Sequence, residues 1–275
     1  MHGPSSSYIH LLKRTLCGFR TQPFDEYHRM DRYSVGWKAT PLKWLDILLN
    51  KLGYRIVKRV RVNPEKRFKG HDIPSDAYTM IGMNRLNHLE QCVSDVLNSG
   101  IPGDLVETGS WRGGATMLMK AMLIERKITN RTVWVADSFR GLPPPDEKKY
   151  PADRNMDLHK RQILSANLSE VKQAFIDFDL LDERVQFLEG WFKDTLPVAP
   201  IEKIALLRLD GDMYESTLDA LTHLYPKLSS GGIVIVDDYG SFQACKSAVD
   251  DYRNAHQIRE DIVDLDGETI HWIKL

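Results

Sequence analysis

Four aspartates follow two apolar runs in the second half of the chain. Asp210 and Asp212 end the run LRLDGD, and Asp237 and Asp238 end the run VIVDDYG. If these runs are neighbouring parallel strands, the four carboxylates meet at one edge of a sheet. Crowded acids raise one another's pKa values, and a hard divalent cation relieves their repulsion. Because only oxygen ligands are nearby, the cluster predicts a Mg²⁺ site rather than a zinc or copper site.

A second interpretation of the aspartates needs no metal. Asp212 and Asp238 would then cap helices or turns, while one acid of the group pairs with Arg208. Two acidic pairs at the ends of successive strands are uncommon, so we favour the metal site.

A glycine-rich turn, ETGSWRGG, occupies residues 107–114 between an apolar run and a helical segment. Gly109 permits a tight turn with positive φ, and Gly113 allows the backbone to approach a ligand. The turn departs from G-x-G-x-x-G, and the chain lacks the G-x-x-x-x-G-K-[ST] motif of P-loop proteins. It therefore indicates either a ligand site of another kind or a tight turn without a ligand.

Two other strand ends carry groups suited to a nucleoside. Asp137 in VWVADS is placed to accept hydrogen bonds from both ribose hydroxyls, unless Asp137 or Ser138 caps a helix. Glu189, Gly190 and Trp191 end the run VQFLEGWF, where they either flank an adenine ring or leave Trp191 in the core.

These residues need a sheet that brings strand ends together. From residue 104, short apolar runs alternate with helical segments, which indicates an open, mostly parallel α/β sheet with helices on both faces. The pair 266–267, Asp-Gly, predicts a hairpin and an antiparallel strand at the end of the chain. Apolar spacing predicts helices over 41–53 and 83–97.

The segment 55–69 holds seven basic side chains and one acid. We interpret it as an edge strand or loop protected by Lys and Arg. The alternative is a basic flap that attracts a phosphorylated or acidic ligand.

Composition excludes several classes of protein. The 275 residues are 42% hydrophobic and 27% charged, which is typical of a globular protein, and the net charge of -1 disfavours a nucleic-acid-binding role. No apolar run reaches the ~18–20 residues that span a membrane, and residues 1–19 contain no evident secretory signal. Cys17, Cys92 and Cys245 are widely spaced, so we expect no disulfide framework, no zinc site and a cytoplasmic location.

Four stretches together resemble the macrocin O-methyltransferase (TylF/MycF) family: DLVETGSWRGGA, VWVADSFRGLPPPD, RLDGDMYESTLDAL and GGIVIVDDYGSF. Members methylate sugar hydroxyls of macrolide and aminocoumarin antibiotics with S-adenosylmethionine and Mg²⁺. The resemblance covers about residues 70–275. It implies a class I methyltransferase, Rossmann-like sheet of seven mostly parallel strands with an antiparallel last strand. We expect an N-terminal helical or lid extension over 1–70 and the methyltransferase domain over 71–275.

The resemblance also implies roles for single residues. Asp210, Asp237 and Asp238 are similar to the metal ligands of the family, and Asp212 falls where a general base is proposed. His159, in NMDLHKRQI, is the alternative base that we weigh from the residues themselves. The residues expected to contact S-adenosylmethionine are Met80, Ile81, Arg85, Glu107, Thr108, Gly109, Ser110, Gly113, Asp137, Ser138, Glu189, Gly190, Trp191 and Asp210.

These expectations combine into one chemical prediction. Methyl transfer from a sulfonium needs an oxygen nucleophile, and Mg²⁺ orients a sugar hydroxyl while a carboxylate takes its proton. We therefore predict an O-methyltransferase for a sugar or glycosylated natural product. The family suggests a homo-oligomer, either a homodimer formed by N-terminal helices or a higher homo-oligomer. The alternatives are the same chemistry on a non-sugar diol such as a catechol, an NAD-binding oxidoreductase, and a non-catalytic nucleoside-binding protein.

Overall fold

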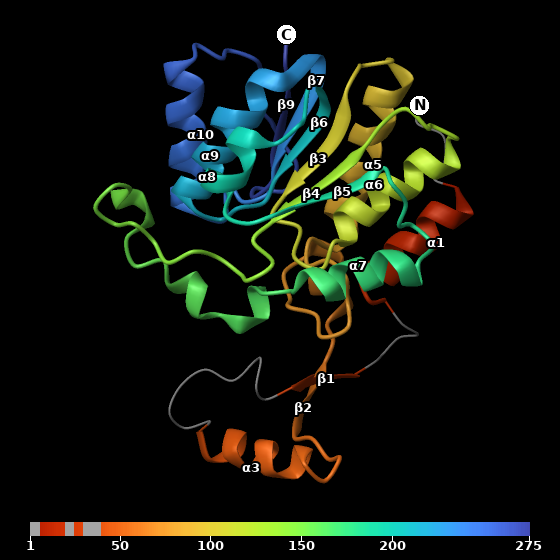
Figure 1. The fold of residues 1–275 in the computed structure, drawn as a ribbon, viewed down its shortest axis with the longest axis vertical. Helices are drawn as coiled ribbons and strands as arrows, with labels where there is room; N and C mark the ends of the chain where they lie inside the picture. The colour runs from red at the N-terminus through yellow and green to blue at the C-terminus, as the bar shows by residue number, and fades with distance from the viewer. Residues whose placement is uncertain (1–5, 20–24, 30–39) are drawn as a thin grey trace.

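The computed structural model describes residues 6–19, 25–29 and 40–275. Its main sheet has seven strands in the order β5-β4-β3-β6-β7-β9-β8 (Figure 1). The strands are β3 (Asp104–Thr108), β4 (Val133–Asp137), β5 (Val185–Glu189), β6 (Ile204–Leu209), β7 (Leu228–Val236), β8 (Val263–Asp264) and β9 (Ile270–Ile273). The strands from β5 to β7 are parallel, whereas β9 is antiparallel to both β7 and β8. This confirms the predicted sheet and its closing hairpin.

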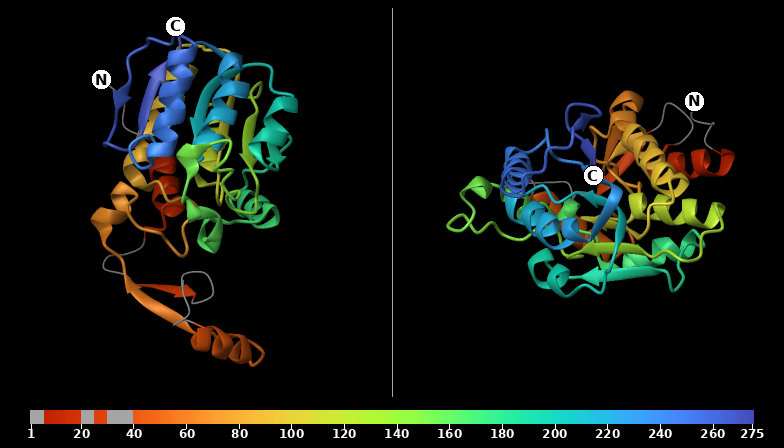
Figure 2. Two further views of the ribbon diagram at one scale, coloured as in Figure 1. Left: turned by 90° about the vertical axis from the view of Figure 1, so that its left-hand side faces the viewer. Right: turned by 90° about the horizontal axis from the view of Figure 1, so that it is seen from above.

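Helices cover both faces of the sheet (Figure 1 and Figure 2). Neighbouring β3 residues face opposite sides: Leu105 joins the core under α1, α5, α6 and α7, and Val106 joins the core under α9 and α10. The helices are α1 (Ser7–Leu16), α3 (Thr40–Asn50), α4 (Pro64–Lys69), α5 (Gly82–Asn98), α6 (Gly114–Glu125), α7 (Leu168–Asp177), α8 (Phe192–Thr195), α9 (Tyr214–Leu224) and α10 (Gln243–Ala255). The helices predicted over 41–53 and 83–97 are thus present as α3 and α5.

One strand end lies directly against the next at Gly109. Gly109 has φ +85°, and a Cβ at this position would lie 1.6 Å from the carbonyl oxygen of Asp210. Only glycine fits such an approach. The turn after β3 and the loop after β6 are therefore in backbone contact.

The N-terminal part contains an arm that leaves the body of the molecule (Figure 1 and Figure 2). It consists of β1 (Asp25–Arg29) paired antiparallel with β2 (Val57–Arg61), and α3 stands at its far end. The strand that we expected within 55–69 is β2, and the rest of that segment forms α4. The sequence did not indicate β1.

Helix α1 packs on the body rather than on the arm, since Ile9, Leu12 and Leu16 belong to the core that faces α5 and α6. The sequence predicts no secretory signal in residues 1–19. Residues 1–5 of that segment lie outside the described residues. Within the part of the chain that the structure describes, no helix is both long enough and apolar enough to cross a bilayer.

Candidate active site

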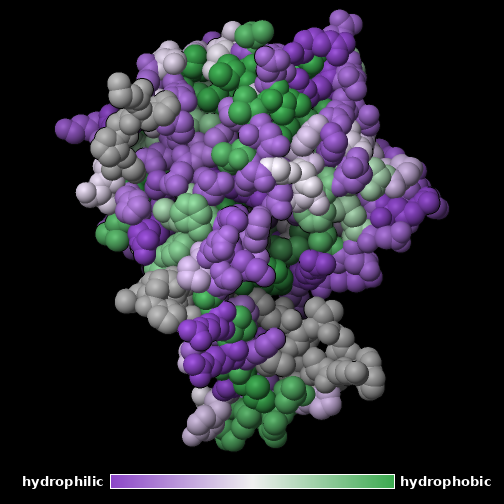
Figure 3. Space-filling model, turned by 180° about the vertical axis from the view of Figure 1, so that it is seen from behind, coloured by the Kyte–Doolittle hydropathy of each residue, from purple (hydrophilic) through white to green (hydrophobic). Residues whose placement is uncertain are grey.

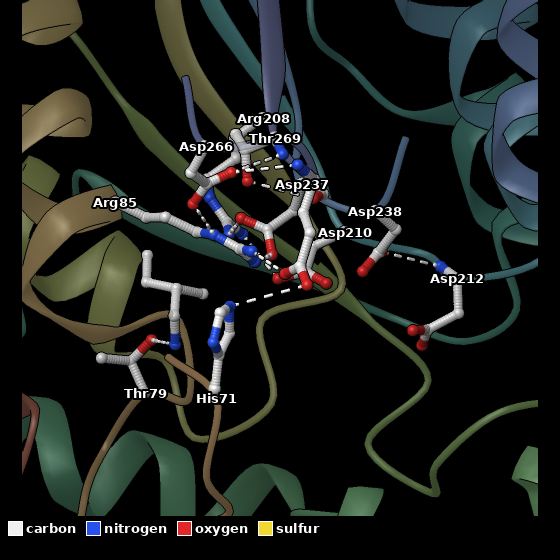
Figure 4. A network of polar contacts seen from close by, with 12 residues as sticks. His71, Thr79, Arg85, Arg208, Asp210, Asp212, Asp237, Asp238, Asp266 and Thr269 are labelled. Carbon is white, nitrogen blue, oxygen red and sulfur yellow. Dashed lines mark hydrogen bonds and ion pairs between the residues drawn. The ribbon is translucent and has the colours of Figure 1, made fainter. Parts of the chain in front are cut away.

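Three aspartates at the ends of β6 and β7 come together at the carboxyl edge of the sheet. Asp210, Asp237 and Asp238 each offer a carboxylate oxygen that lies within 4.8 Å of the other two (Figure 4). They meet because β6 and β7 are adjacent and parallel, with Leu209 paired to Val236. The oxygen-only donor set suits a hard cation such as Mg²⁺.

Arg208 lies beneath these acids and is almost fully buried. Its Nη1 donates to Glu107 at 2.7 Å and to Asp210 at 2.8 Å, and its Nη2 donates to Asp237 at 2.5 Å. The pairing of an acid with Arg208, which the metal-free interpretation assumed, is therefore present. It does not displace the metal interpretation, because each carboxylate oxygen has a further lone pair.

Arg85 holds the outer side of the cluster (Figure 4). It donates to Asp237 at 2.8 Å, to Asp266 at 2.9 Å and to Glu268, and Glu268 also lies 3.6 Å from His71. Both oxygens of Asp237 thus receive an arginine N–H, which fixes the orientation of that carboxylate.

The acids of the cluster are poorly neutralised despite these arginines. Burial raises the pKa of Asp210 although Arg208 opposes the rise. Burial and the charge of Asp212 raise the pKa of Asp238 well above its ordinary value. Removal of this mutual repulsion by a divalent cation is the physical reason for expecting one here.

Asp212 stands beside the cluster rather than in it (Figure 4). Its backbone has φ +57°, and its N–H donates to the Asp238 carboxylate at 3.1 Å. Burial, followed by the charges of Asp210 and Asp237, raises the pKa of Asp212 to about 8. Asp212 is one of the residues that line a cavity next to the acids.

That cavity runs along the carboxyl ends of β3, β4, β5 and β6 and, measured out to its open mouth, holds about 910 Å³. Ten of the fourteen residues expected to contact S-adenosylmethionine line it. They are Met80, Ile81, Glu107, Gly109, Ser110, Asp137, Ser138, Gly190, Trp191 and Asp210.

Asp137 also ties two loops together. One carboxylate oxygen accepts the N–H groups of Ser110 at 2.8 Å and Trp111 at 3.0 Å, and the other accepts the N–H of Phe139 at 2.8 Å. Burial raises the pKa of Asp137 although these hydrogen bonds oppose the rise. Its carboxylate therefore braces the glycine-rich turn at the edge of the cavity.

Four residues expected to contact the cofactor are absent from the cavity lining: Arg85, Thr108, Gly113 and Glu189. The guanidinium of Arg85 is engaged by the carboxylates of Asp237, Asp266 and Glu268. Gly113 is the N-cap of α6, and a Cβ there would lie 3.0 Å from Val171.

Thr108 and Glu189 are outside the lining for opposite reasons, since one is buried and the other is exposed. Thr108 is buried in β3, whereas the Glu189 side chain is exposed and lies 4.0 Å from Arg140. His159, the alternative base, is also outside the lining, on a 3-10 turn (Asp157–Lys160) of the long loop after β4.

Sequence reasoning missed one wall of the cavity. The long loop after β4 contributes Gly141, Leu142, Pro143 and Leu164, and the first turns of α9 contribute Glu215, Ser216 and Asp219. The proline cluster GLPPPD signalled a loop, but nothing local indicated that the loop returns over the strand ends.

Comparison with known proteins connects this geometry to a family. The family model described as Macrocin-O-methyltransferase (TylF) matches residues 5–274. Demethyldecarbamoylnovobiocin O-methyltransferase of Streptomyces niveus is 53% identical over 209 residues, which are 76% of this chain and 80% of that protein. A Streptomyces olivaceus enzyme, 8-demethyl-8-(2,3-dimethoxy-alpha-L-rhamnosyl)-tetracenomycin-C 4'-O-methyltransferase, is 50% identical over 209 residues, again 76% of this chain and 80% of that protein.

The solved structure of the O-methyltransferase NovP has the same fold. It superposes with a TM-score of 0.84 at 44% identity, over 98% of this chain and 99% of that one. The methyltransferase fold implies S-adenosylmethionine as the cofactor and decides against the NAD-binding oxidoreductase and the non-catalytic binding protein. The chain belongs to the macrocin O-methyltransferase (TylF) family and is an O-methyltransferase.

Proposed function

We propose that this enzyme transfers the methyl group of S-adenosylmethionine to a hydroxyl of a sugar on a glycosylated natural product, and that Mg²⁺ assists the transfer. The observation that carries this proposal is the position of Asp210. It is one of three clustered carboxylates, and it also lines the cavity of the predicted cofactor residues. A metal-bound acceptor would therefore lie next to the methyl donor. The rhamnosyl group in the name of the Streptomyces olivaceus relative supports a sugar acceptor.

Asp210, Asp237 and Asp238 would hold the metal. When bound, Mg²⁺ supplies a positive charge that orients the acceptor hydroxyl and stabilises developing charge on its oxygen. Arg208 and Arg85 keep Asp237 in one orientation. Asp212 is our candidate for the group that accepts the hydroxyl proton, because it is a carboxylic residue that lines the same cavity as Asp210.

The cofactor would occupy the cavity over the Gly109 turn. Asp137 and Ser138 lie at the end of β4, where a ribose is commonly held, and Gly190 and Trp191 follow β5. The lining combines apolar side chains and acids, which suits a cofactor that carries a sulfonium charge.

Mass spectrometry of candidate glycosides tests the proposal. The enzyme is incubated with each glycoside, Mg²⁺ and an isotopically labelled methyl donor, and a catechol is included to test the non-sugar diol. We expect label on a glycoside and loss of transfer when the metal is removed with a chelator. Label on the catechol alone would overturn the sugar assignment.

The variant Asp237→Asn separates metal from cofactor. We expect methyl transfer to fall by at least about 100-fold, since one charge of the ligand set is lost, while calorimetry shows cofactor affinity within about 3-fold of wild type. Asp146→Asn, a change in the long loop outside the cavity lining, is the control. Full activity of Asp237→Asn in metal-free buffer would contradict the assignment of Mg²⁺.

We also propose that the N-terminal part mediates a homodimer and serves as the lid extension over 1–70, next to the methyltransferase domain over 71–275. Support comes from α3 at the end of the arm, where Trp44 is 69% exposed and Leu48 59% exposed. Figure 3 shows this apolar end below a hydrophilic stretch of the arm.

The cytoplasmic location stays a prediction, and the three cysteines are buried free thiols.

A further inference from the structure

Asp153 is a completely buried acid on the long loop between β4 and α7. One of its carboxylate oxygens accepts the N–H of Tyr214 at 2.6 Å, and the other accepts the N–H of Glu215 at 3.0 Å. The two partners are the first residues of α9 and lie more than sixty positions further along the chain.

Helix α9 needs this acid because its own N-cap residue cannot do the same work. The N-cap is Met213, which has no side-chain oxygen to accept the first N–H groups of the helix. Asp153 supplies that acceptor from another part of the chain, and its negative charge also faces the positive end of the helix dipole. The contact therefore determines where α9 begins.

What lies immediately before α9 is the loop Asp210-Gly211-Asp212. Asp212 has left-handed backbone geometry, and a single residue, Met213, separates it from the anchored helix start. Each residue has only two backbone bonds that rotate freely, so one intervening residue cannot absorb a movement of the helix start. A shift at Tyr214 therefore moves the Asp212 carboxylate.

The same contact also anchors the cavity wall. The long loop is held near its start by Ser138, which donates to the Gly141 carbonyl at 2.5 Å, and near its end by Trp111, which donates to the Ile163 carbonyl at 2.9 Å. Asp153 holds the middle. The lining residues of the loop, Gly141, Leu142, Pro143 and Leu164, are at or next to the two outer anchors, and Asp153 ties down the stretch that joins them.

We propose that Asp153 is a positioning residue: it fixes the Asp212 carboxylate and the long loop at one distance from each other, and so sets the acceptor side of the site. This inference rests on the proposed function in one respect, since it takes Asp212 as a group that acts on the acceptor. Its structural half, the anchoring of α9 by Asp153, is independent of that assignment.

The test compares Asp153→Ala and Asp153→Asn with Asp157→Asn, a change of an exposed carboxylate on the same loop. Rates are divided by the number of cofactor-binding sites titrated in each preparation, so that a loss of folded protein does not count. We expect kcat to fall about 10- to 100-fold in Asp153→Ala, with KM for S-adenosylmethionine changed less than about 3-fold. Asp153→Asn keeps one acceptor oxygen and should recover part of the loss, whereas Asp157→Asn should match wild type.

Hydrogen exchange separates this inference from the proposed function. In Asp153→Ala the amides of Tyr214 and Glu215 should exchange at least about 10-fold faster, with or without any methyl acceptor. If wild type methylates no glycoside, the proposed function fails while the exchange result still decides the anchoring. Unchanged exchange, or a kcat per site equal to that of Asp157→Asn, overturns the inference. Should Asp153→Ala not fold, Asp153→Asn carries the same comparison.

Discussion

Arg208 is a single buried cation that serves three carboxylates, Glu107, Asp210 and Asp237. An arginine suits this place because its planar group donates in several directions and stays charged when buried. Burial nevertheless raises the pKa of Glu107 to about 7 although Arg208 opposes the rise. The site thus keeps its acids close together at a cost in stability, which is what the proposed metal site requires.

Removal of this arginine should destabilise the whole domain. We expect Arg208→Met to lower the free energy of unfolding by about 3–5 kcal/mol, because it leaves buried acids without their partner. Urea unfolding measures the change. Arg126→Met, which replaces an exposed arginine bound to Asn98 and Ser94, should change stability by less than about 0.5 kcal/mol. Equal stability of the two variants would show that the acids do not depend on Arg208.

At the scale of elements, the sheet could be predicted from the sequence because short apolar runs, such as those of β4 and β6, alternate with helical segments. All six residues of β6 are buried, as in parallel strands covered on both faces. The sequence did not predict the strand β1, because its residues, DEYHR, form neither an apolar run nor a clear alternation of apolar and polar side chains. The arm it forms could not be foreseen from residues 55–69 alone.

The site was predictable to a similar degree and for a similar reason. Asp210 and Asp237 follow apolar strands, so parallel topology alone brings them together. The contact of Asp153 with α9 could not be predicted, because it joins an irregular loop to a helix far along the chain. The partners of Arg85 were equally beyond prediction, because Asp266 and Glu268 lie on the last hairpin, far along the chain.

The junction between α6 and β5 provides a prediction about pH. Lys120 of α6 is buried, and its Nζ donates to Asp182 at 2.6 Å, as does Arg184 at 2.6 Å. Burial raises the pKa of Asp182, but the hydrogen bonds from these two cations outweigh it and lower the pKa below its ordinary value. The stabilisation is therefore complete above the unfolded pKa of about 3.9 and is lost as the pH falls through the folded value.

Asp182→Asn should accordingly lower the free energy of unfolding by about 2 kcal/mol at pH 7, because Lys120 loses its charged partner. The difference from wild type should shrink on acidification below about pH 4, where wild type loses the same contact. Urea titrations at several pH values follow this. Asp177→Asn, on the exposed end of α7, is the control, and a difference that stays constant from pH 7 to pH 3 would contradict the assignment.

At the scale of the whole molecule, the arm is notable because it carries exposed apolar side chains away from the core of the body. Exposed apolar side chains on α3 are typical of a surface that another chain covers. We expect Leu45→Glu combined with Leu48→Glu to weaken the proposed dimer at least about 10-fold, since charges would enter the apolar contact. Sedimentation over a range of concentrations measures it, with Val198→Glu, an exposed apolar position on the body, as the control. A wild-type protein that sediments as a monomer throughout would refute the homodimer.

The backbone contact between Gly109 and Asp210 has a consequence for protein engineering. The turn after β3 and the loop after β6 touch without an intervening side chain, so neither can be enlarged or lengthened alone. Redesign toward a new acceptor should therefore leave 107–114 and 210–212 untouched. The variation belongs in 139–165, whose irregular path tolerates replacement as long as its anchors are kept.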